Sequence, residues 1–86
     1  MSTELPGPPA RITLVSRPGC HLCDDARVVI EAVAARQGVG WRELSIDDDA
    51  ELRARYAEQI PVTLVDGVQH DFFRVSAERL TAALTS

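Results

Sequence analysis

The sequence predicts a single α/β domain in which a four-stranded mixed sheet carries helices on both faces. Two observations support this fold class. Short apolar, β-branched runs alternate along the chain with segments whose apolar residues recur at helical spacing. Towards the C-terminal end, Asp66-Gly67 separates two strand-like runs, as in a tight hairpin. The predicted order is β-α-β-α-β-β-α, and 86 residues suffice for one such domain with one small core.

The first half of the chain predicts a strand, a helix and a second strand. Residues 11–16 are mostly apolar and β-branched, which is typical of a central strand covered on both faces. Residues 41–47 alternate in polarity, which indicates a strand nearer the edge. The helix between them ends at Gly38 and has inward positions at helical spacing, namely Leu22, Ala26, Val29, Ile30 and Val33. Two strands joined in this way form a right-handed unit with parallel strands.

The second half predicts a short helix, a hairpin and a last helix. Asp48 followed by Glu51 resembles a capping box, so a helix is expected over roughly residues 49–58. The hairpin strands are expected at 62–65 and 68–73, with a proline at the entry of the first. Inward contacts of the two helices are expected from Leu52, Tyr56, Leu80, Ala83 and Leu84, with Ser76 capping the last helix.

Composition and charge exclude several classes of function. The net charge is −4 and the basic residues form no cluster, so a nucleic-acid partner is not expected. No apolar run is long enough to span a membrane. Residues 1–10 are rich in proline and lack the features of a signal peptide, so a flexible lead-in is expected before a domain at 11–86. A cytoplasmic monomer without membrane contact is therefore expected.

The two cysteines, Cys20 and Cys23, lie where the first strand feeds the first helix, with Pro18-Gly19 as the turn. Cys-x-x-Cys at such a turn is typical of a dithiol–disulfide redox site. A helix N-terminus stabilises a thiolate because its N–H groups are unpaired and its dipole is positive there. Cys20, at the tip, is therefore the expected nucleophile. Cys23, about one turn later, is expected to be less exposed and to resolve the mixed disulfide.

Other side chains near the cysteines are candidates for tuning them. Arg17 either adds positive charge at Cys20 or is a solvated surface charge. His21 either tunes the thiolate and shuttles protons near neutral pH or is an exposed residue at the helix start. Asp24 and Asp25 suit the helix dipole but oppose thiolate formation.

Four ring-bearing residues and one acidic run outside the motif favour structural roles. Trp41, Phe72 and Phe73 are expected to pack in the core or against a sheet face. His70 is expected to be a surface or half-buried residue of the hairpin. The acidic run at 47–49 resembles a set of metal ligands but is better explained as a helix cap on a solvated loop.

This order of elements, with Cys-x-x-Cys at the first strand-to-helix turn, resembles the thioredoxin fold in its minimal, glutaredoxin-like form over residues 11–85. Proteins of that fold carry a cis-proline before the third strand, facing the cysteines, and Ile60-Pro61-Val62-Thr63 stands at that point. The resemblance implies a cis bond before Pro61. It also implies a substrate groove at Pro61, Ile60 and Val62, where an extended substrate chain pairs with the backbone.

The stretch 17–23, together with Asp66-Gly67 and residues 73–76, is similar to that of small bacterial glutaredoxin-like proteins. The resemblance implies a dithiol thiol–disulfide oxidoreductase that needs no cofactor. The implied partners are protein or small-molecule disulfides and glutathione or another small thiol. Glutaredoxins use a Gly-Gly turn to hold the glutathione carboxylate, and here Phe73-Arg74-Val75 occupies that region. Arg74 is therefore the candidate for holding a carboxylate in its place.

Two other functions stay open on the sequence alone. Cys20 and Cys23 supply two ligands for a metal or an iron–sulfur cluster, and His21 and His70 are further candidates, although a structural zinc site normally takes four ligands. Alternatively, the chain is a non-enzymatic module that binds a partner through the groove beside Pro61.

Overall fold

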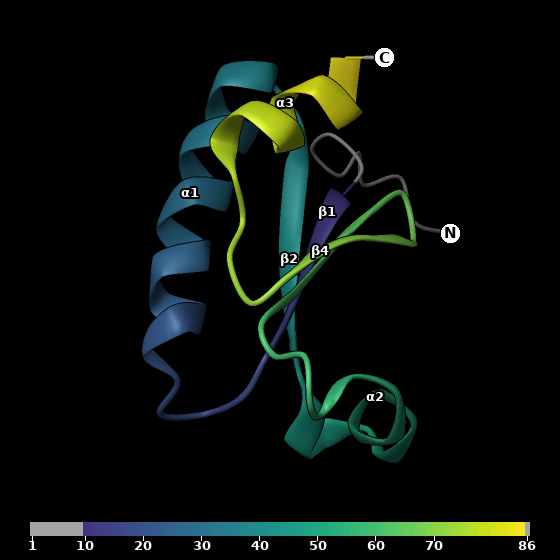
Figure 1. Cartoon of the computed structure of the whole chain (residues 1–86). Coiled ribbons are helices and arrows are strands. Elements are labelled where there is room, and N and C mark those ends of the chain that lie inside the picture. The colour runs from purple at the N-terminus through teal and green to yellow at the C-terminus, as the bar shows by residue number, and fades with distance from the viewer. Residues whose placement is uncertain (1–9, 86) are drawn as a thin grey trace, which may run out of the picture.

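The computed structural model describes residues 10–85 and contains a four-stranded mixed sheet between helices (Figure 1). The strands lie in the order β2-β1-β3-β4, with bounds of Ala10–Ser16 for β1, Gly40–Ser45 for β2, Val62–Val65 for β3 and Val68–Phe72 for β4. β1 pairs with β2 in parallel and with β3 antiparallel, and β3 pairs antiparallel with β4. The predicted fold class and the edge position of the second strand are confirmed.

Three helices cover the sheet. α1 (His21–Gln37) and α3 (Ala77–Thr85) pack on one face, whereas α2 (Ala50–Tyr56) packs against the other near its end (Figure 1). A single 3₁₀ turn, η1 (Ile46–Asp48), leads into α2. In the part of the chain that the structure describes, no helix is long and apolar enough to cross a membrane. The expected lead-in lies outside the described residues except for Ala10, which already belongs to β1.

Local signals in the sequence end and join these elements as predicted. α1 ends at Gly38, whose φ of 68° is left-handed and whose backbone N–H donates to the Ala34 carbonyl. The hairpin turn has φ values of 53° at Asp66 and 84° at Gly67, as a tight two-residue turn requires. The Ser76 hydroxyl accepts a hydrogen bond from the N–H three residues later at 3.2 Å and caps α3.

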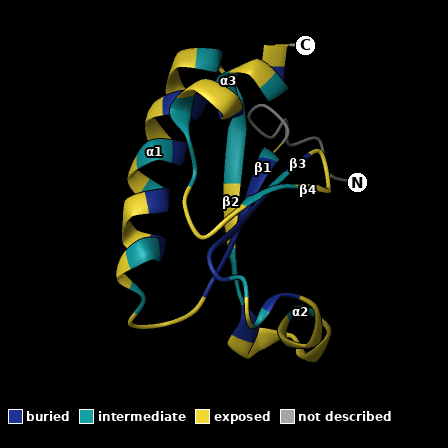
Figure 2. Ribbon diagram, viewed as in Figure 1, coloured by how far each residue is buried: buried dark blue, intermediate teal, exposed yellow. Residues whose placement is uncertain are grey.

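The core consists of two clusters on opposite faces of the sheet (Figure 2). Ile12 and Leu14 of β1 face α1 and α3, where they pack with a buried set that includes Ile30, Val33, Val65, Leu80 and Leu84. Val15 faces the other side, where it packs with Cys23, Ile46, Tyr56, Ile60 and Val62. Because β1 lies inside the sheet and contributes to both clusters, its middle is fully buried.

The start of α2 differs from the expectation. Asp49 caps this helix, not Asp48, because its Oδ1 accepts hydrogen bonds from the backbone of Glu51 and Leu52 at 2.8 and 3.3 Å. Asp48 belongs to η1, which begins where the Ser45 hydroxyl accepts a hydrogen bond from the backbone two residues later at 3.1 Å. α2 is correspondingly shorter than the predicted 49–58 segment.

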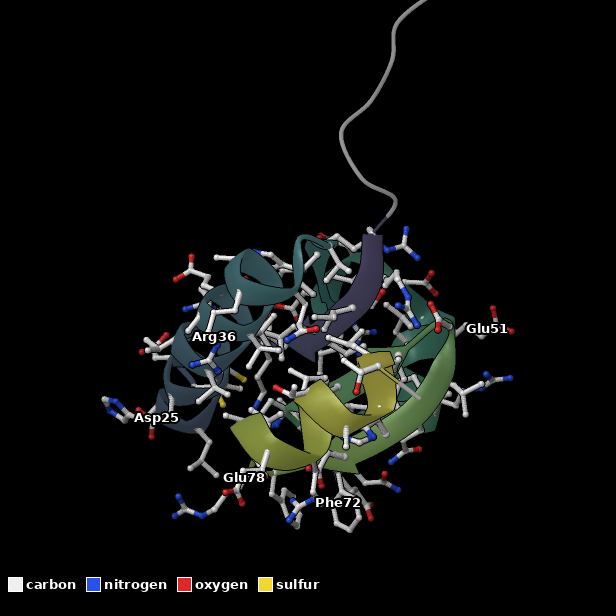
Figure 3. All side chains as sticks on the ribbon, turned by 90° about the horizontal axis from the view of Figure 1, so that it is seen from above. Asp25, Arg36, Glu51, Phe72 and Glu78 are labelled. Carbon is white, nitrogen blue, oxygen red and sulfur yellow. The ribbon has the colours of Figure 1, made fainter. Side chains whose placement is uncertain are left out.

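Neither Phe72 nor Phe73 lies in the core, which is one of the two placements expected for them. Phe72 and Phe73 are 48% and 45% exposed, and their rings meet edge to face with centroids 5.0 Å apart. Phe72 ends the edge strand β4 and points outward (Figure 3). Phe73 has a left-handed φ of 63°, and its N–H donates to the Pro61 carbonyl at 2.7 Å. Trp41 packs against the α1–α3 cluster as expected, and His70 is half-buried.

Core burial of α1 predicts the cost of removing its side chains. Ile30 is fully buried in the larger cluster, whereas Val28 on the same helix is 66% exposed. Ile30→Ala should lower the free energy of unfolding by about 2–5 kcal/mol, because it removes buried methyl groups and leaves a cavity. Val28→Ala, the matched control, should change it by no more than about 0.5 kcal/mol. Urea unfolding of both variants measures this, and equal losses would contradict the assignment of the core.

Candidate active site at the start of helix α1

A tight turn carries the chain from the end of β1 to the start of α1. Pro18-Gly19 forms this turn, and Gly19 has a left-handed φ of 73°, which side chains with a Cβ rarely adopt. The turn delivers Cys20 to the N-cap of α1 in an extended conformation, with φ −102° and ψ 113°. The cysteine pair therefore begins at the point where the helix leaves its backbone N–H groups unpaired.

The sulfur of Cys20 occupies the capping position. Its Sγ accepts a hydrogen bond from the backbone N–H of Cys23 at 3.2 Å. The Cys20 side chain is partly exposed and lines a pocket of about 240 Å³. An anion at this place faces a backbone donor and the positive end of the helix dipole, so the site suits a thiolate nucleophile.

Cys23 lies one turn further along, in the core. It is only 1% exposed and packs in the cluster that contains Val15 and Val62. Burial is the main reason that the pKa of the Cys23 thiol lies well above its usual range, and a side-chain hydrogen bond with Cys20 raises it further. A hydrogen bond from the Arg17 backbone partly offsets this rise. Cys23 is therefore held as a thiol at neutral pH.

A network of charged side chains lines the pocket beside Cys20. The Arg27 guanidinium donates to both carboxylate oxygens of Glu43 on β2, at 2.8 and 2.7 Å, and to Asp24 at 2.8 Å. The buried Ser16 hydroxyl donates to the same Glu43 carboxylate at 2.6 Å. Hydrogen bonds from Arg27 and Ser16 hold the pKa of Glu43 below its usual value despite partial burial. Glu43 therefore stays ionised at neutral pH.

Sequence reasoning missed this network. Arg27 follows Cys23 by four residues, so helical spacing alone places the two on adjacent parts of one helix face. Glu43 could not be found in the same way, because it reaches the site only through the parallel pairing of β2 with β1. Asp24, which was expected to oppose a thiolate, is instead neutralised in part by its ion pair with Arg27.

The other tuning candidates lie on the surface near the cysteines. Arg17 is exposed and lines the same pocket as Cys20. His21, the first residue of α1, is exposed, and its side chain makes no hydrogen bond within residues 10–85. Asp25 is exposed and points away from the domain (Figure 3).

The segment before β3 lies against the cysteines. The Ile60–Pro61 bond is cis, as the resemblance implies. Ile60, Pro61 and Val62 are all buried, and the first and last of them share the cluster that contains Cys23. Any contact they make with another molecule therefore runs through the backbone or the rim of the side chains.

A second pocket flanks α1 on the side of the segment between β4 and α3. Its volume is about 200 Å³, and it is lined by Leu22, Asp25, Ala26, Val29, Phe73, Arg74 and Val75. Arg74 is exposed and makes no ion pair within residues 10–85, so its guanidinium is available to an anion. Among the described residues, no group of three or more His, Cys, Asp or Glu side chains is arranged to hold a metal ion.

The sheet order, the Cys-x-x-Cys pair at the start of α1 and the adjacent cis-proline define a thioredoxin-fold protein of the glutaredoxin-like type. The chain belongs to the family described as Glutaredoxin-like domain (DUF836), whose model matches residues 11–85.

Individual proteins and solved structures are also similar to this chain. An uncharacterized protein of Mycobacterium tuberculosis is 30% identical over 79 residues, which cover 84% of this chain and 79% of the relative. A structural-genomics target protein from X. campestris superimposes with a TM-score of 0.65 at 36% identity, over 85% of this chain and 93% of the other. A thioredoxin of Fasciola hepatica, at 23% identity, has a TM-score of 0.58 over 86% of this chain and 76% of its own, and it shows the shared fold.

The unequal environments of the two thiols predict unequal chemical reactivity. At pH 7 iodoacetamide should alkylate Cys20 at least about tenfold faster than Cys23, because burial and a raised pKa keep Cys23 protonated. Peptide mass mapping of the reduced protein after timed alkylation measures both rates. In urea the two thiols should react at similar rates, which is the control. Equal rates in the folded protein would contradict the structure of the site.

Proposed function

We propose that the protein is a dithiol thiol–disulfide oxidoreductase in which Cys20 attacks a disulfide and Cys23 resolves the product. The observation that carries the proposal is the inequality of the pair. One sulfur is accessible and accepts a helix-terminal N–H, and the other is buried and held as a thiol next to it. The membership in a glutaredoxin-like family supports the same class of chemistry.

The reaction follows from these positions in two exchanges. The Cys20 thiolate attacks a disulfide R–S–S–R′, the Cys20–S–R bond forms, and R′–S⁻ leaves and takes a proton from water. Cys23 then loses its proton to water or to a departing thiolate and attacks the Cys20 sulfur. The Cys20–Cys23 disulfide forms and R–S⁻ leaves. The substrate gains two electrons, the protein dithiol loses two, and two equivalents of an external thiol restore the dithiol.

In this proposal, an extended substrate pairs mainly with the backbone of Ile60. Val62 is already paired within the sheet, with Val15 on one side and Phe72 on the other. The Pro61 carbonyl accepts the N–H of Phe73. The Ile60 backbone makes no hydrogen bond with the described part of the chain, which supports its use by an extended substrate.

The proposal assigns supporting roles to three exposed side chains. Arg17 adds positive charge to the pocket that Cys20 lines, and His21 adjoins Cys20 at the helix start. Arg74 holds the carboxylate of a small thiol such as glutathione at the second pocket. The protein is proposed to work as a cytoplasmic monomer on protein or small-molecule disulfides.

Substitution of each cysteine tests the mechanism. Cys20→Ser should abolish reduction of a model peptide disulfide, because no nucleophile remains at the helix terminus. Cys23→Ser should still attack but accumulate the mixed disulfide through Cys20, because nothing resolves it. Activity assays and intact-protein mass spectrometry distinguish these outcomes. Normal activity in Cys20→Ser, or a metal bound to the purified protein through the cysteines, would overturn the proposal.

The role of Arg74 is tested with a charged small substrate. Arg74→Gln should raise KM for a mixed disulfide of glutathione about three- to tenfold, because an exposed charge-assisted contact to its carboxylate is lost. The turnover of a neutral disulfide such as hydroxyethyl disulfide should not change. Arg53→Gln, which removes an exposed arginine from α2, is the matched control. Equal effects on both substrates would exclude carboxylate recognition by Arg74.

A further inference from the structure

Arg27, four residues after Cys23 on α1, binds both acidic groups of the pocket beside Cys20. Its guanidinium makes a two-pronged ion pair with Glu43 and a third contact with Asp24, all at 2.7–2.8 Å. About a third of the Arg27 side chain and somewhat less of the Glu43 side chain remain exposed. Ser16, which is 4% exposed, holds Glu43 from the end of β1. The guanidinium is thereby held between β2 and α1, the helix that Cys20 caps and on which Cys23 lies.

Arg27 is the cation nearest to Cys23 on its own helix. The four-residue spacing puts the two on one side of α1, and Arg27 and Cys20 line one pocket. Its positive charge acts to lower the pKa of Cys23, against the larger effect of burial. The other ionisable groups around Cys23 and this pocket are Cys20 at the N-cap of α1, Asp24 on α1, Glu43 on β2, Arg17 in the preceding turn, and Tyr56 on α2.

We infer that Arg27, held in place by Glu43 and Ser16, is a positioning residue that favours the Cys23 thiolate at the moment when the mixed disulfide is resolved. The effect of Arg27 on the resolving step rests on the proposed function, whereas the contacts among Arg27, Glu43 and Ser16 are those of the reduced protein. Once Cys20 is bonded to substrate, its own charge is gone. The fixed charges that line this pocket are then those of Arg17, Asp24, Arg27 and Glu43, and Arg27 is the one that follows Cys23 by a helical turn.

Glu43 does not act as a base in this arrangement. Both of its oxygens accept hydrogen bonds from Arg27, and Oε2 also accepts one from Ser16. These contacts keep the pKa of its carboxyl group below the usual value, so Glu43 has little tendency to take a proton. The Cys23 proton therefore goes to water or to a departing thiolate, and the contribution of the network is electrostatic.

Arg27 and Glu43 carry opposite charges, so removing one charge or the other should shift the pKa of Cys23 in opposite directions. Arg27→Gln leaves Asp24 and Glu43 uncompensated, and this should raise the pKa of Cys23. Glu43→Gln removes a negative charge while Arg27 keeps Asp24, and this should lower it. A purely structural ion pair predicts otherwise, because loss of either partner breaks the same contact and should change the site in the same direction.

The experiment follows the resolving step and the Cys23 thiol separately. The first readout is the rate of intramolecular release from a preformed mixed disulfide at Cys20, measured across a pH series. The second is the pH titration of the Cys23 Cβ signal by NMR in a Cys20→Ser background, which needs no redox activity. Both are recorded for Arg27→Gln, Glu43→Gln, the double variant and Arg27→Lys.

The controls carry the same charge changes away from the cysteines. Arg36→Gln removes a cation from the other end of α1 (Figure 3), about 20 Å from Cys23 along the helix axis. Glu31→Gln removes an exposed carboxylate from the same helix. Neither should change the release rate or the titration.

At pH 7 release should be about three- to tenfold slower in Arg27→Gln and faster by a similar factor in Glu43→Gln, with opposite displacements of the titration midpoint. The release rate and titration midpoint of Arg27→Lys should stay closer to those of the unsubstituted protein. Those of the double variant should fall between the values of the single variants. Shifts in one common direction, or rates that change without a midpoint shift, would overturn the inference. Opposite midpoint shifts in a protein that forms no mixed disulfide would support the network and overturn the proposed function.

Discussion

The site depends on one constraint, which is that a sulfur atom caps helix α1. Helix N-caps are usually oxygen atoms of Ser, Thr, Asp or Asn, which satisfy one of the unpaired N–H groups of the first turn. Here the Cys20 sulfur accepts the N–H of Cys23. A thiolate is a better hydrogen-bond acceptor than a thiol, so the geometry that begins the helix also suits the nucleophile of the proposed exchange. In the proposed mechanism, the atom that caps the helix is therefore also the nucleophile.

The inequality of the two cysteines follows from how α1 lies on the sheet. The turn after β1 leaves Cys20 at the rim, and the next helical turn brings Cys23 against Val15 and Val62 in the core. Burial disfavours the Cys23 thiolate, which suits the proposed role of a residue that keeps its proton until its partner has reacted. A pair of equally exposed thiols would have no such order. The central position of β1 therefore helps to make the two environments unequal, as the proposed division into an attacking and a resolving cysteine requires.

Most of the fold was predictable because its signals are local. The buried strand β1, the Asp66-Gly67 turn and the left-handed Gly38 each specify structure through neighbouring residues alone. The incorrect predictions concern residues whose environment is set by tertiary contacts. Phe72 looks like a core residue in sequence, but it ends an edge strand and stays exposed. The cap of α2 falls on Asp49, one of three consecutive aspartates, because Asp47 and Asp48 belong to the 3₁₀ turn that Ser45 begins.

The position of the cysteine pair could likewise be predicted from neighbouring residues, whereas the charged groups around it could not. An acidic first turn looks unfavourable for a thiolate when the sequence is considered alone, because Asp24 lies four residues from Cys20. In the folded chain Arg27 binds Asp24 and Glu43 together, and β2 supplies the second of these carboxylates. The first turn can thus keep the negative charge that suits the helix dipole without leaving it unpaired beside the sulfur. The balance of charge at the cysteines is set by the docking of α1 on β2, which no single segment of the sequence encodes.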